Sequence, residues 1–68
     1  MKKCVIQVQY MSSSGFAMGD WQDLHHINNP TTQTVTSEMV MASKRIKRAR
    51  IRAVDQDGRL VDIMPMVG

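Results

Sequence analysis

The 68-residue sequence contains few of the residues that crosslink or anchor a small core. It has one Tyr, one Phe and one Trp, and its single cysteine, Cys4, excludes an intramolecular disulfide. Methionine, by contrast, occurs seven times, and it fills irregular space without specifying the packing. A chain of this length buries only about 60% of its unfolded surface. We therefore expect one domain, residues 1–68, with a small stability margin and a core that a second copy in a homodimer could complete.

Long apolar runs are also missing. No stretch approaches the roughly 18 apolar residues that a membrane span requires. The start of the chain, Lys2-Lys3 followed by apolar residues, resembles a signal peptide, but Gln7 and Gln9 interrupt the run too early. These absences predict an intracellular, soluble protein of the cytoplasm that has no membrane partner.

Positive charge is absent from most of the chain and concentrated in one short stretch. Residues 4–43 contain no Lys or Arg, whereas residues 44–52 contain six cations and no acid. The formal net charge is +3, which is compatible with a nucleic-acid partner but small for a dedicated binder. The uneven distribution predicts a localised cationic surface.

The N-terminal part of the chain predicts a β-hairpin. Apolar residues alternate with other residues along positions 4–11, at Cys4, Ile6, Val8 and Tyr10. This period of two predicts a half-buried strand. Residues 12–15, Ser-Ser-Ser-Gly, are typical of a turn, and we expect a second strand over residues 16–26, bent near Gly19.

The middle of the chain predicts one amphipathic helix, over about residues 33–46. Its apolar stripe has the spacing i, i+4, i+7 and i+11 and consists of Val35, Met39, Ala42 and Ile46. The helix could begin after an Asn29 N-cap, directly before Pro30. It could equally begin a few residues later, because residues 31–34 are poor helix formers.

The period changes from helical to two after about residue 47. Ala49, Ile51 and Ala53 then face one way, and Arg48, Arg50 and Arg52 the other. Residues 55–59, Asp-Gln-Asp-Gly-Arg, predict a hairpin with a three-residue loop and Gly58 in the left-handed region. This register would pair Ile51 with Ile63 and Arg52 with Asp62, and Pro65 would end the last strand or place it at an edge.

Together these patterns predict an α+β domain in β-β-α-β-β order. A small antiparallel sheet would carry the helix on one face, and the order of the strands within the sheet stays open.

The six cations of residues 44–52 are the candidate binding surface. Arginines at alternate strand positions lie roughly 6.6 Å apart, close to the phosphate spacing of a nucleic-acid strand. The alternative is a solvated sheet face on which Asp62 neutralises Arg52. No aromatic residue interrupts the arginines, which disfavours single-strand binding by base stacking. The candidate residues are Lys44, Arg45, Lys47, Arg48, Arg50 and Arg52.

Trp21 has two interpretations. Tryptophan is enriched at interfaces, which makes it a candidate interface residue. In a chain with three aromatic residues we favour a core anchor.

No residue pattern predicts catalysis, a metal or a cofactor. His25 and His26 are adjacent, so in a strand they point to opposite faces and cannot easily chelate one ion. Cys4 lies on the inward face of the first strand and has the character of a small buried apolar residue. A nucleophile, a base and an orienting group within reach of one another are not indicated. We therefore expect a protein that is not an enzyme.

Two segments resemble small proteins of β-β-α-β-β build that bacteriophages and prophages encode. They are Val8-Gln9-Tyr10 with Ser14-Gly15-Phe16 and Asp20-Trp21, and residues 50–55 with residues 57–61. The resemblance implies an accessory protein of the host cytoplasm. Some members of this class are anti-CRISPR proteins or other inhibitors of host factors.

Three hypotheses follow for the function. The first is a small binding protein that blocks a host protein or nucleoprotein complex through the basic surface. The second is direct DNA or RNA binding with low specificity, and the third is an oligomeric structural component of a phage.

Overall fold

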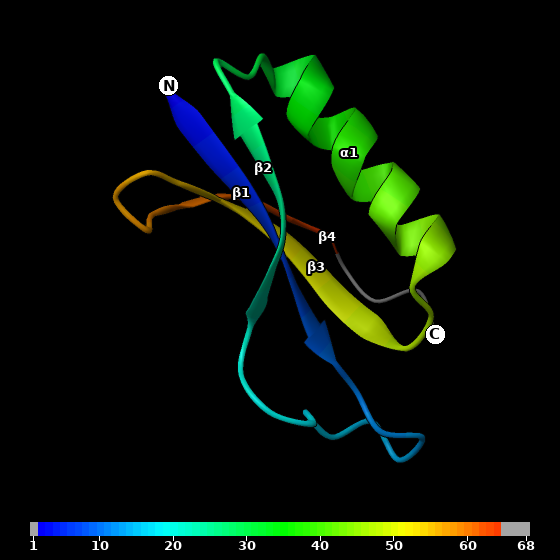
Figure 1. The fold of residues 1–68 in the computed structure, drawn as a ribbon. Helices are drawn as coiled ribbons and strands as arrows, with labels where there is room; N and C mark the ends of the chain where they lie inside the picture. Colours follow the sequence, from blue (N-terminus) through cyan, green and yellow to red (C-terminus); the bar gives the residue numbers. More distant parts are fainter. Residues whose placement is uncertain (1, 65–68) are drawn as a thin grey trace.

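The computed structural model describes residues 2–64, which form β1 (Lys3–Tyr10), β2 (Gln22–Asn28), α1 (Thr32–Arg45), β3 (Ala49–Asp55) and β4 (Leu60–Met64). The four strands form one antiparallel sheet in the order β2-β1-β3-β4. Helix α1 connects β2 with β3 and lies along one face of the sheet (Figure 1). The predicted α+β class, element order and placement of the helix are confirmed.

The core lies between α1 and the two central strands, β1 and β3. The predicted alternation turns one set of strand side chains toward the helix, namely Cys4, Ile6, Val8, Ile51 and Ala53. The predicted helix stripe covers them with Val35, Met39 and Ala42, and Ile46 packs at the margin. The edge strands contribute little, since Ile27 is the one buried residue of β2. The opposite face of the sheet carries no helix within the described residues.

Helix α1 begins at the later of the two predicted positions. Thr31 is the N-cap, and its hydroxyl accepts a hydrogen bond from the Thr34 backbone N–H at 3.1 Å. Asn29 instead adopts a left-handed backbone with φ +49°, so it ends β2 rather than capping the helix. Within residues 2–64, no helix has the length and apolar character needed to cross a membrane.

Two turns have the same hydrogen-bond pattern and a glycine with positive φ at the same position. In the β3–β4 turn, the Asp55 carbonyl accepts from Gly58, the Asp55 N–H donates to the Arg59 carbonyl, and Gly58 has φ +80°. The Asp55 carboxylate also accepts from the Arg59 N–H. This is the predicted three-residue loop. The turn that follows β1 repeats the pattern, with Ser12, Gly15 and Phe16 in place of Asp55, Gly58 and Arg59.

The predicted register beyond the β3–β4 turn is wrong. A second irregularity between Ala53 and Val54 shifts the pairing, so Arg52 lies opposite Ile63 and Ala53 opposite Asp62. The hydrophobic pattern holds register firmly only where one face of a strand is buried. Strand β4 lies at the sheet edge with its first four residues exposed, so little burial opposes the shift. Pro65, predicted to end this strand, lies outside the described residues.

The predicted second strand, residues 16–26, is also displaced. Strand β2 runs from Gln22 to Asn28, and residues 11–19 form a separate arm that continues the β1 hairpin through a Met11–Ala17 bridge. Figure 1 shows this arm projecting from the end of the sheet. Strand β2 carries its own bulge, since the pairing with β1 shifts between Ile6 and Gln7.

Candidate binding site on the open sheet face

The open face of the sheet, opposite α1, carries Arg50 and Arg52. Because Ile51 and Ala53 are buried beneath the helix, Arg50 and Arg52, which alternate with them along β3, must face the other way. Strand β1 pairs with β3 so that Gln7 lies opposite Arg52 and Gln9 lies opposite Arg50. The two central strands therefore present two arginines beside two glutamines.

Trp21 lies beside both arginines and outside the core. The centre of the Arg52 guanidinium is 4.2 Å from the Trp21 ring centroid, and that of Arg50 is 5.6 Å away. Both distances are within the range of cation–π attraction. Trp21 is half-buried and absent from the buried core, so its interpretation as a core anchor is wrong. An aromatic ring does accompany the arginines, contrary to the sequence-based expectation.

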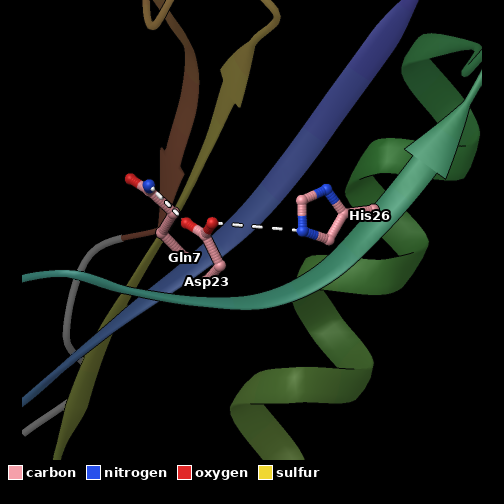
Figure 2. Close-up of polar contacts among 3 residues, drawn as sticks. All are labelled: Gln7, Asp23 and His26. Carbon is pink, nitrogen blue, oxygen red and sulfur yellow. Dashed lines mark hydrogen bonds and ion pairs between the residues drawn. The ribbon is translucent and has the colours of Figure 1, made fainter.

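A chain of polar contacts holds Arg52 in place. Its Nε donates to the Gln7 Oε1 at 2.8 Å, and the Gln7 Nε2 donates to the Asp23 Oδ1 at 2.9 Å. The Asp23 Oδ2 lies 3.9 Å from the His26 Nε2, an ion pair when the imidazole is protonated. Figure 2 shows the Asp23 carboxylate lying between the Gln7 amide and the His26 ring. The two ends of the Gln7 amide thus link a cation on β3 to a carboxylate on β2.

The predicted Arg52–Asp62 ion pair is wrong. The shifted register places Asp62 opposite Ala53, and its Oδ1 accepts the backbone N–H of Ile63 at 2.8 Å. Arg52 takes Gln7 and Trp21 as neighbours instead. Within residues 2–64, the ion pairs join histidines to carboxylates, and none involves an arginine.

The six predicted cations do not form one surface. Arg48 precedes β3 and has φ +57°, which interrupts the strand alternation that would have aligned it with Arg50. Lys44 and Arg45 belong to the last turn of α1, on the covered side of the sheet, and Lys47 lies in the connection. Arg45 lines a hollow of about 260 Å³ beside Leu24 and His25 of β2. The sequence stretch is therefore divided between two faces and one loop.

His25 and Cys4 lie apart from the arginines, whereas His26 lies at the end of the polar chain, beside Asp23. His25 contacts Glu38 of α1 at 3.8 Å, whereas His26 contacts Asp23, as expected for neighbours on opposite faces. Residues 2–64 contain no group of three or more side chains able to hold a metal ion. Cys4 is fully buried, and burial, with Asp55 nearby, raises the pKa of its thiol above the ordinary value. A thiol held in its neutral form is a poor nucleophile.

The open face carries groups whose chemistry suits anions. Guanidinium groups donate hydrogen bonds in a planar array that matches carboxylate and phosphate oxygens. Trp21 and the Gln7 relay limit the freedom of Arg52, while Arg50 is exposed. Sequence reasoning missed Gln7 and Asp23, although the polar positions of β1 already pointed to the face opposite Ile6 and Val8.

Comparison of the chain with protein-family models, with curated proteins and with solved structures finds no match. Function is therefore inferred from the geometry and chemistry of the open face.

Proposed function

We propose that this is a non-enzymatic binding protein of the phage accessory type, which engages a host protein or nucleoprotein complex through its open sheet face. The observation that carries the proposal is the pair of arginines beside Trp21, with Arg52 aligned by Gln7. Arginine and tryptophan are the residues most enriched at interface hot spots.

Preorganisation supports a role in recognition. The Gln7 amide holds Arg52 through one hydrogen bond and is itself fixed by Asp23, so less rotamer entropy is lost when a partner binds. Arg50 remains exposed and is free to donate to a carboxylate or phosphate of the partner. The face thus combines one fixed cation with one accessible cation.

Affinity capture with matched charge variants tests this proposal. The tagged full chain is incubated with a bacterial lysate, alongside Arg50→Glu and, as control, Arg59→Glu. Arg59 is exposed in the β3–β4 turn, away from Trp21, and the two substitutions change the net charge equally. We expect the same protein to be recovered by the wild type and by Arg59→Glu but not by Arg50→Glu. Equal recovery by all three chains would contradict the proposal.

Direct binding of single-stranded nucleic acid is the second candidate. It is favoured by Trp21, because an aromatic side chain among arginines is typical of such sites. Two phosphate contacts, from Arg50 and Arg52, predict a salt slope of roughly −1.4, so affinity should fall about sevenfold between about 50 and 200 mM salt. Fluorescence anisotropy of a labelled oligonucleotide measures this. No binding at about 50 mM salt would exclude the nucleic-acid role and leave the protein partner.

A further inference from the structure

A second surface lies on the arm, residues 11–19, which projects from the end of the sheet (Figure 1). Its backbone is well connected: Ser12 donates to the Phe16 carbonyl at 2.7 Å, and Met18 donates to the Tyr10 carbonyl at 2.8 Å. The Gln9 side chain donates to the Gly19 carbonyl at 3.0 Å and fixes the C-terminal end of the arm to β1. The arm is therefore a hydrogen-bonded hairpin with a defined shape.

One side of this hairpin is apolar and exposed. The bonded pairs Tyr10–Met18 and Ser12–Phe16 lie two residues apart along each strand, so Tyr10, Phe16 and Met18 share a side. Phe16 is 74% exposed, Met18 65% and Tyr10 40%. Folding gains little from these side chains in such positions. In a chain with a single Phe, its placement at the outer end of an ordered hairpin points to contact with another molecule.

The charges around the arm restrict what that molecule can be. Residues 10–19 carry no charged side chain. The end of the arm next to the sheet adjoins the α1–β3 connection, because the Met11 N–H donates to the Arg48 carbonyl at 2.8 Å. Lys47 precedes Arg48, and both are exposed. The arm thus has an apolar outer end and cations next to the sheet. Such a surface is complementary to an apolar pocket bordered by carboxylates.

Two other occupants fit less well. In a pair of arms, the second copy would supply no carboxylate, because residues 10–19 carry no charge and the adjoining Lys47 and Arg48 are cationic. A membrane fits less well, because segments that bind anionic lipid carry clusters of about four to eight Lys or Arg. The end of the arm next to the sheet adjoins two exposed cations, Lys47 and Arg48.

We propose that the arm is a docking element for a protein with an apolar pocket bordered by carboxylates, and that Phe16 is its anchor. This inference rests on the proposed function, because it assigns a second contact surface for the host protein. Phe16 enters the pocket, and Met18 and Tyr10 cover its rim. Lys47 and Arg48, in the α1–β3 connection, face the carboxylates.

Site-specific photo-crosslinking tests the docking element. The full chain is produced in bacterial cells with benzoylphenylalanine in place of Phe16, and the adduct is identified by mass spectrometry. The expected adduct is a single host protein whose contact site is apolar and flanked by Asp or Glu. Replacing one such carboxylate with its amide should weaken binding by the purified partner. An adduct between copies of this chain, an adduct with lipid, or no adduct would overturn the proposal.

Affinity measurements with the identified partner separate this inference from the proposed function. Phe16→Ser should weaken binding by about tenfold or more, as expected for an interface anchor. The matched control is Leu60→Ser, another exposed apolar residue at 58%, which should change affinity less than about twofold. If Arg50→Glu abolishes binding and Phe16→Ser does not, the proposed function stands and the docking element is refuted. If Phe16→Ser alone weakens binding, the docking element stands and the open face has another role.

Discussion

Replacing Arg52 with alanine should destabilise the fold, whereas replacing Arg50 should have little effect. The two arginines lie on one face of one strand, two residues apart, so the change in intrinsic strand preference cancels in the comparison. They differ in their contacts. Arg52 is half-buried and bonded to Gln7 at 2.8 Å, whereas Arg50 is exposed and has no side-chain hydrogen bond within residues 2–64.

The expected magnitude follows from these contacts. The hydrogen bond from Arg52 to Gln7 contributes about 1 kcal/mol net. The cation–π contact at 4.2 Å adds about 0.5–1 kcal/mol at a partly exposed site. Arg52→Ala should therefore cost about 1.5–2 kcal/mol, which corresponds to a decrease in Tm of roughly 6–16 °C for a domain of this size. Arg50, 5.6 Å from the ring, should cost less than about 0.5 kcal/mol.

Urea unfolding provides the assay. Trp21 is the single tryptophan and reports on the open face through its fluorescence, and far-UV circular dichroism monitors the backbone independently. A double-mutant cycle with Gln7→Ala should give a coupling energy with Arg52 of about 0.5 kcal/mol or more. Equal losses for Arg50→Ala and Arg52→Ala, or no coupling with Gln7, would refute the assigned role of Arg52 as the fixed cation.

Two further predictions concern the helix cap and the buried thiol. Thr31→Ala removes the acceptor for the Thr34 N–H and should cost about 1 kcal/mol in urea unfolding, and Thr31→Ser should restore most of it. Cys4 should react slowly with a disulfide reagent at pH 8 in the folded state and rapidly in urea, because it is fully buried. Burial and Asp55 raise its folded pKa, so the unfolded thiol ionises first and stability should decline as the pH rises past the ordinary thiol value. A Cys4→Ala variant should lack this thiol-dependent decline.

Several features of the fold were predictable because they depend on residues close together in the chain. The alternation of Cys4, Ile6 and Val8 predicts which side of β1 is buried, whatever strand lies beside it. The turn around Gly58 was predictable in detail, since a left-handed residue after a short polar loop favours one hairpin class. Local patterns therefore predicted the order of the elements and the covered face of the sheet.

The candidate site was less predictable because its members come from different strands. Trp21 meets Arg52 only because β1 lies between β2 and β3 in the sheet, and local patterns do not choose that order. Arg48 does not align with Arg50 and Arg52, because its positive φ interrupts the strand alternation where the chain passes from α1 to β3. Lys44 and Arg45 lie on α1 and Lys47 lies between α1 and β3, so most of the basic stretch is away from the open face.

The amino-acid pattern alone determined one basic stretch, one amphipathic helix and the buried sides of β1 and β3. The hydrophobic period and the residue preferences of turns act over a few neighbouring residues, so both can be recognised in the amino-acid sequence. The pairing of strands determined that Gln7 joins Arg52 to Asp23, that Asp62 turns away from Arg52, and that Phe16 stands exposed on the arm. These relations depend on contacts between distant residues and on an edge strand too lightly buried to keep its predicted register, and only tertiary packing decides them.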